Sequence, residues 1–148
     1  MSQKTKLLYA LWQKAISKSF TQCMKNVQLL SIADGKCKAQ FTVAEEHLNI
    51  FGTLHGGFTS TVVDVISSYA LSSYESGSGS LLEDRHVSID LHITFLKAAF
   101  PGEVVTVNAE TIRKGKSLVF LAVELSKNDG KDIVARGQHT KFILPVKQ

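Results

Sequence analysis

Residues 56–73 read GGFTSTVVDVISSYALSS and hold one charged residue, Asp64, among apolar and small hydroxyl side chains. A helix with almost no charged face is expected to be buried, so this stretch predicts a central helix over about 57–74. Its β-branched residues would also suit a strand. The length of the stretch, the glycine pair that opens it and the glycine-serine tract after it favour the helix.

Strand-like runs lie on both sides of this helix. Upstream, residues 27–33 and 36–43 flank Asp34-Gly35, which suits a two-residue hairpin turn because both positions tolerate positive φ. Downstream, short turn sequences separate longer β-prone runs. Short turns join antiparallel neighbours, so we expect consecutive strands to pair mostly with each other. The longer runs cover residues 87–96, 104–112, 118–125 and 133–143.

The remaining segments complete one domain. Residues 5–17 carry apolar side chains at helical spacing, which is typical of an amphipathic helix that packs onto the body of a protein. Apolar and polar residues alternate over 87–96, an alternation that puts Ser88 on the face opposite the apolar stripe. The elements predict a single α+β domain over 1–148, in which a curved antiparallel sheet of about six strands wraps around one long helix.

Composition narrows the class of protein. The chain has 148 residues, 44% of them hydrophobic and 20% charged, as in an ordinary globular domain, and lacks the roughly 20-residue apolar run of a membrane span. Its net charge of +4 suits an anionic partner. Two cysteines without metal spacing predict reduced thiols, and therefore a location in the cytoplasm or the mitochondrial matrix. A lysine-bearing stretch before Asp34 resembles a mitochondrial transit segment but lacks Arg.

A possible oxyanion site precedes the central helix. The run Asn49-Ile-Phe-Gly-Thr-Leu-His55-Gly56-Gly57 enters the helix directly, where backbone N–H groups lack intrahelical acceptors. Glycines leave the Gly57 N–H open to a substrate carbonyl, and Asn49 is a candidate second polar contact. The alternative is that the glycines serve only the turn and that His55 is structural.

Asp64 is the candidate catalytic carboxylate. An unpaired charge in an apolar helix is costly, so the residue calls for a functional or a structural explanation. The structural alternative is a carboxylate bonded to nearby Ser or Thr side chains. Ser88, on the strand after the helix, is a candidate for orienting a water molecule, although a solvated strand face would explain it as well.

Basic residues are candidates for binding a phosphorylated ligand. Arg113, Lys114 and Lys116 cluster at one turn, and His139 and Lys141 lie on the last strand; simple solvation is the alternative explanation. The histidines lack metal-ligand spacing, so we expect no metal. The sequence also lacks a serine nucleophile elbow, a nucleotide-binding fingerprint and a nucleic-acid-binding motif.

Taken together, the residues from Asn49 to Asp64 and the run Val87-Ser88-Ile89-Asp90 resemble the hotdog-fold acyl-CoA thioesterases, in particular their thioesterase superfamily member 2 group. The resemblance extends over nearly the whole chain. It implies hydrolysis of medium- to long-chain fatty acyl-CoA without a metal, a resident cofactor or a serine nucleophile. In that mechanism the Gly57 N–H polarises the thioester carbonyl, Asn49 positions it, Asp64 activates water or attacks, and Ser88 orients the water.

The resemblance also implies an assembly. Each site would lie between two subunits of a homodimer, with Asn49 and Gly57 from one chain and Asp64 and Ser88 from the other, and dimers would pair into tetramers. CoA would be part of the substrate rather than a cofactor. The expected CoA or substrate contacts are His55, Gly56, Phe95, Arg113, Lys114, Lys116, His139 and Lys141.

Two other functions stay open from the sequence. A hydratase or dehydratase acting on enoyl-CoA would need a histidine and a carboxylate together, and His55 is the only candidate histidine near the central helix. A non-catalytic acyl-CoA-binding protein would use Asp64 only structurally. Both alternatives require the acyl-CoA partner and neither requires nucleic acid or a membrane span.

Overall fold

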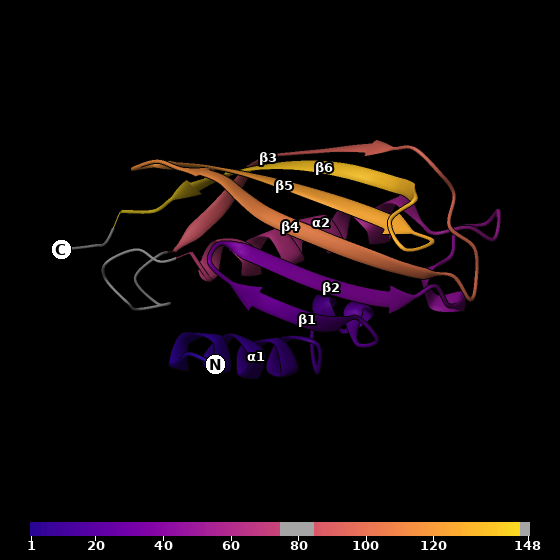
Figure 1. Ribbon diagram of the computed structural model, residues 1–148, viewed down its shortest axis with the longest axis horizontal. Coiled ribbons are helices and arrows are strands. Elements are labelled where there is room, and N and C mark those ends of the chain that lie inside the picture. Colours follow the sequence, from indigo (N-terminus) through magenta and orange to yellow (C-terminus); the bar gives the residue numbers. More distant parts are fainter. Residues whose placement is uncertain (75–84, 146–148) are drawn as a thin grey trace.

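The computed structural model describes residues 1–74 and 85–145; the glycine-serine tract at 76–80 lies outside the described residues. Two helices and a six-stranded antiparallel sheet form the fold (Figure 1). The predicted elements are all present, with ends within about two residues of those expected. They are α1 (Gln3–Ala15), β1 (Gln28–Ala33), β2 (Lys36–Thr42), α2 (Gly56–Ser72), β3 (His86–Phe95), β4 (Val104–Lys114), β5 (Leu118–Lys127) and β6 (Asp132–Ile143), with short 3₁₀ turns at Phe20–Met24 and Glu45–His47.

The order of the strands differs from the expected succession of neighbours. The sheet runs β1-β2-β4-β5-β6-β3, so β3 pairs with β6 at one edge while β4 pairs with β2 and β5. The prediction that consecutive strands pair therefore fails between β3 and β4. Residues 96–103 join them, and a connection of that length crosses the sheet instead of closing a hairpin. The crossing leaves β3 as an edge strand.

The first hairpin is confirmed. Asp34 and Gly35 have φ values of 52° and 77°, which is the left-handed pair that a type I′ turn requires. Strands β1 and β2 pair directly up to this turn, from Ala33 opposite Lys36. The turn also packs closely against the segment that follows the central helix. A side chain at Gly35 would come within 2.7 Å of the ring of Tyr74.

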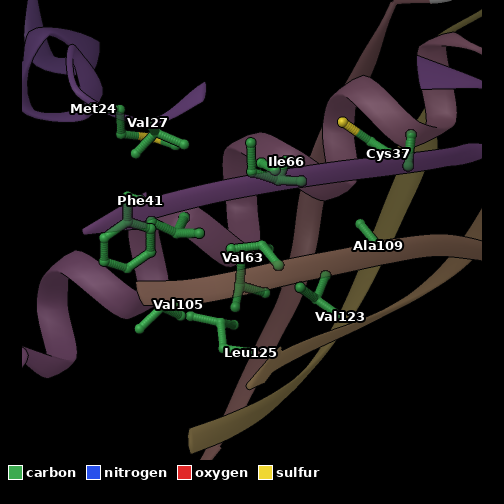
Figure 2. Packing of buried hydrophobic residues seen from close by; sticks show 14 of the residues in the cluster. Met24, Val27, Cys37, Phe41, Val63, Ile66, Val105, Ala109, Val123 and Leu125 are labelled. Carbon is green, nitrogen blue, oxygen red and sulfur yellow. The ribbon is translucent and has the colours of Figure 1, made fainter. Parts of the chain in front are cut away.

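The central helix supplies one wall of the core. Figure 1 shows the sheet curved around α2, with α1 lying outside beside β1. Val63 and Ile66 of α2 are fully buried and belong to one cluster with Phe41 of β2 and Val105 of β4 (Figure 2). Helix α1 adds Trp12, whose ring meets Tyr69 of α2 edge-on at 5.4 Å. Leu7 and Leu11 of α1 stay partly exposed, so its buried stripe is narrower than its sequence pattern suggested.

Gly137 of β6 marks the closest approach between α2 and the sheet. A side chain there would lie 2.5 Å from one methyl group of Val63, which is fully buried and cannot move aside freely. We therefore expect Gly137→Ala to lower the free energy of unfolding by about 1–3 kcal/mol, the usual cost of overpacking a core. Urea unfolding measures this, with Gln138→Ala on the exposed face as the matched control. Equal midpoints for the two variants would contradict the packing described here.

A bulge in β3 reverses the face of Ser88. The register between β3 and β6 shifts between Ser88 and Asp90, so Ser88 lies opposite Lys141 and Asp90 opposite Thr140. Directly opposed residues point to the same side of a sheet, and Lys141 is buried on the helix side. The expectation that Ser88 lies on the face opposite the apolar stripe is therefore wrong. The extra residue, Ile89, turns Ser88 toward α2.

Candidate active site

Asp64 lies on the part of α2 that faces β6 and the edge strand β3. Its carboxylate is 3.9 Å from His139 Nε2, and 47% of its side chain is exposed. The expectation of a fully buried charge is therefore corrected: the helix leaves this one carboxylate half open to solvent at the rim of the sheet. A carboxylate that is partly solvated and partly surrounded by protein is suited to receive a proton from a water molecule.

A chain of hydrogen bonds runs behind Asp64. Ser88 Oγ of β3 lies 2.8 Å from His139 Nε2, and His139 Nδ1 lies 2.7 Å from Ser67 Oγ of α2. The Ser67 hydroxyl also donates to the backbone carbonyl of Asp64 at 3.1 Å. Residues from β3, β6 and α2, far apart in the sequence, thus meet around one carboxylate.

Lys141 adds a buried positive charge to this group. Its ammonium donates to Ser68 Oγ at 2.8 Å, and the Ser68 hydroxyl donates to the Asp64 carbonyl at 2.8 Å. Burial lowers the pKa of Lys141, while the nearby Asp64 charge raises it. The positive charge of Lys141 therefore partly compensates the negative charge of Asp64. We name the six residues Asp64, Ser67, Ser68, Ser88, His139 and Lys141 the carboxylate cluster.

The placement of His139 and Lys141 corrects their grouping with the basic turn. Only 1% of His139 and 4% of Lys141 is exposed, so neither is a solvated strand residue. The expectation that His55 is the only candidate histidine near the central helix fails as well, because His139 approaches Asp64 through the fold and not through sequence spacing. The sequence analysis also missed Ser67 and Ser68. Their positions three and four residues after Asp64, on the same face of the helix, were the available signal.

His139 is neutral at physiological pH. Its pKa is lowered to about 4, mainly by burial and also by the Lys141 charge, while the Asp64 and Asp90 charges act in the opposite direction. In the unfolded chain a histidine takes up its proton near pH 6.5. Between these two values the unfolded state binds more protons, so acidification removes stability.

We therefore expect the wild type to lose up to about 3 kcal/mol of stability through His139 as the pH falls from 6.5 to 4. A His139→Gln variant lacks this titration and should show a smaller loss over the same interval. Urea unfolding at pH 7 and pH 4 gives the comparison. The same acid-induced loss in both proteins would mean that His139 does not carry it.

The loop before α2 is held by Asn49. Its side-chain oxygen accepts from the backbone N–H groups of Phe51 and Thr53, at 2.9 and 3.2 Å, and its side-chain nitrogen donates to Thr53 Oγ1 at 2.9 Å. Gly52 allows the loop to turn with a φ of 78°. Asn49 therefore shapes the loop, in addition to any contact it makes with a substrate.

The Gly57 N–H, the expected oxyanion donor, has a partner in this structure. It donates to His55 Nδ1 at 2.8 Å, so His55 caps the helix with its ring. A carbonyl oxygen must replace this ring nitrogen to reach the donor. The ring of Phe95 covers the neighbouring Gly56, since a side chain at Gly56 would lie 3.3 Å from it. A cavity of about 350 Å³ lies here, and its lining includes Asn49, Gly56 and Phe95.

Gly57 and Asp64 lie at different levels of α2. Seven residues separate them along α2, and at 1.5 Å per residue this corresponds to about 10 Å. The oxyanion donor and the carboxylate cluster therefore form two half-sites on the same helix. The family resemblance implies that the two half-sites which meet in one active site come from different chains.

The basic turn between β4 and β5 lies near the end of α2 that is farther from Gly57. Lys114 Nζ is 5.6 Å from the ring centroid of Tyr74, which follows the helix directly. Arg113 and Lys116 are exposed. Across the sheet, Lys114 lies opposite Val119 of β5, which lies opposite Lys141 of the carboxylate cluster. The contact of the basic turn with CoA stays a prediction.

Other candidate sites lie elsewhere or do not form. A hollow of about 580 Å³ contains none of the predicted site residues; Lys38, Asn108 and Arg136 are among those that line it. Within residues 1–74 and 85–145, no three His, Cys, Asp or Glu side chains gather closely enough to hold a metal ion. Over the same ranges, neither helix has the length and apolarity that crossing a membrane requires.

Comparison with known proteins adds independent findings. The family model described as the thioesterase superfamily matches residues 51–147. Human acyl-coenzyme A thioesterase 13 is 38% identical over 132 residues, which cover 88% of this chain and 90% of the human protein. Zebrafish thioesterase superfamily member 2 superimposes with a TM-score of 0.87 at 33% identity, over 97% and 100% of the two chains. The mouse member 2 structure gives a TM-score of 0.82 at 35% identity, over 96% and 98%.

Proposed function

This chain belongs to the thioesterase superfamily, and we propose that it hydrolyses acyl-CoA thioesters to a free acid and CoA. The observation that carries the proposal is the carboxylate cluster, in which a half-exposed Asp64 is backed by the Ser88 hydroxyl and the buried Lys141 charge. The name of its 38% identical human relative supports acyl-CoA as the substrate.

In the proposed reaction, Asp64 takes a proton from a water molecule whose position Ser88 fixes. The water oxygen attacks the thioester carbonyl carbon, and the developing oxyanion accepts a hydrogen bond from the Gly57 N–H. The C–S bond then breaks, CoA leaves as the thiolate, and the proton held by Asp64 goes to sulfur. Direct attack by the Asp64 carboxylate, through an anhydride that water opens, leads to the same products and remains the second route.

We further propose that the site is completed by a second copy of the chain. The separation of about 10 Å along α2 between the two half-sites supports this. Strand β3, which carries Ser88, offers the surface for contact between the two copies. It lies at the edge of the sheet and exposes apolar side chains, among them Val87, Ile89 and Leu91. An apolar sheet edge is a natural surface for strand-to-strand pairing. Pairing of such dimers into tetramers is proposed from the family resemblance alone.

The medium- to long-chain acyl preference is likewise a proposal. The cavity beside Gly56 has apolar walls from Leu54, Phe95, Leu96 and Val134, which suit an acyl chain. The exposed Arg113 and Lys116 suit the CoA phosphates. We propose that no resident cofactor takes part, and that the protein works in a reducing compartment, the cytoplasm or the mitochondrion.

A panel of acyl-CoA substrates tests the proposed function. We expect free thiol to be released from saturated acyl-CoAs of eight to sixteen carbons, with kcat/KM higher than for acetyl-CoA because each buried methylene adds favourable contact. A trans-2-enoyl-CoA should yield free thiol and the unsaturated acid, with no 3-hydroxyacyl-CoA formed. Hydration without thiol release would favour the hydratase alternative, and tight binding without turnover the acyl-CoA-binding alternative.

A further inference from the structure

The positions of the protons in the carboxylate cluster can be assigned from its hydrogen bonds. The Ser67 hydroxyl has one proton and two neighbours, the Asp64 carbonyl at 3.1 Å and His139 Nδ1 at 2.7 Å. A carbonyl oxygen can only accept, so the Ser67 proton points to it. The contact with His139 is then a hydrogen bond only if Nδ1 carries a proton and donates it to Ser67.

The protonation of Nδ1 fixes the other side of the ring. A neutral imidazole has a single N–H, so with Nδ1 protonated His139 Nε2 is an acceptor and receives the proton of Ser88 at 2.8 Å. Ser88 Oγ then faces the outside of the cluster with its lone pairs. The attacking water would donate one proton to Asp64 and the other to Ser88.

The opposite arrangement fits the contacts less well. It would turn the Ser67 proton toward Nδ1 and leave the Ser67 contact with the Asp64 carbonyl without a proton. It would also place an N–H on Nε2, which would donate to Ser88 Oγ at 2.8 Å and leave the Ser88 hydroxyl a donor, not an acceptor, toward the attacking water. Ser67 is fully buried, so no solvent molecule can compensate for a lost partner there.

We infer that Ser67 and His139 form a positioning relay that holds the Ser88 hydroxyl as a hydrogen-bond acceptor for the attacking water. This inference rests on the proposed hydrolysis and specifies the role of Ser88 within it. Ser67 and His139 touch neither substrate nor water and act only through Ser88. Because Ser67 and His139 are buried, they hold the Ser88 hydroxyl in one orientation.

The tautomer of His139 is the direct test and needs no variant. In ¹⁵N-labelled wild-type protein at pH 7, long-range ¹H–¹⁵N correlation should show a protonated Nδ1 and an unprotonated Nε2 for His139. The Ser67→Ala variant should lose this pattern or reverse it, because Nδ1 then has no acceptor. An Nε2-protonated ring in the wild type would overturn the inference, whether or not the protein hydrolyses any thioester.

Kinetics give the second test, on palmitoyl-CoA. Ser67→Ala and His139→Leu should each lower kcat by about tenfold with little change in KM, the size expected for one hydrogen bond. Adding either change to Ser88→Ala should cost nothing more, because all three remove the same interaction. Ser72→Ala, which removes a hydroxyl that donates to the Ser68 carbonyl, is the control and should keep wild-type turnover.

Losses that multiply in the double variants would overturn the relay. A wild-type protein that releases no thiol would instead refute the proposed function, and the tautomer measurement would still decide the proton positions. If His139→Leu fails to fold, His139→Gln replaces it, because a glutamine side-chain oxygen can still accept from Ser88. That variant should then retain more activity than Ser67→Ala, and equal loss would count against the relay.

Discussion

Replacing Asp64 with Asn should lower the turnover of acyl-CoA by about 10³-fold, within the range by which a general base accelerates a reaction. The amide keeps the size and shape of the carboxylate but cannot accept a proton from water. KM should change little, because the carboxylate is expected to contact the water and not the acyl chain. Release of free thiol from palmitoyl-CoA, measured with the wild type and the variant side by side, gives the ratio.

Asp90→Asn is the matched control for this prediction. Asp90 is also a carboxylate near His139, but the bulge in β3 turns it to the opposite face of the sheet, beside Thr140. It should therefore keep wild-type turnover. Circular dichroism and urea unfolding must show that both variants fold. Full turnover by a folded Asp64→Asn protein would leave the carboxylate cluster with a structural role only.

Two inactive variants should restore activity when they share a dimer. Gly57→Val places a side chain where the substrate carbonyl would approach the N–H, and Asp64→Asn removes the base. If each site combines the Gly57 loop of one chain with the Asp64 cluster of the other, a mixed dimer contains one intact site and one that is doubly damaged. We expect about half of wild-type turnover from mixed dimers purified through two different tags.

The homodimers of each variant serve as controls and should both be inactive. Mixed dimers with no activity would mean that each chain builds its own site, which the separation of about 10 Å along α2 argues against. A monomeric wild type that is fully active would contradict the shared site in a different way. Analytical ultracentrifugation of the same preparations distinguishes these outcomes.

Much of the fold follows from local patterns in the sequence. The apolar stretch around Asp64 predicted α2 because a helix without a charged face has to be buried, and Asp34-Gly35 predicted a turn whose dihedral angles the structure reproduces. The pairing of β3 with β6 could not be predicted in this way. Local turn signals describe which strands follow one another, whereas the crossing of residues 96–103 depends on the packing of the whole sheet.

The candidate site was predicted in its parts but not in its arrangement. Asp64 and Ser88 were identified as candidates from residue type and resemblance, yet the alternation of β3 placed Ser88 on the wrong face. A β-bulge adds one residue without any clear sequence signal, so periodicity cannot reveal it. His139 and Lys141 looked like solvated strand residues, because nothing in the sequence near them shows that they lie beneath α2.

The most direct test of the central claim is to identify the products of the wild-type protein acting on palmitoyl-CoA in H₂¹⁸O. The proposed hydrolysis predicts equal amounts of free CoA and palmitic acid, with ¹⁸O from the solvent in the acid over many turnovers. Mass spectrometry of the acid and thiol titration of the CoA measure both from one sample. Intact palmitoyl-CoA after prolonged incubation would contradict the proposed function. Acyl-CoA binding without hydrolysis would then be the better explanation of this fold.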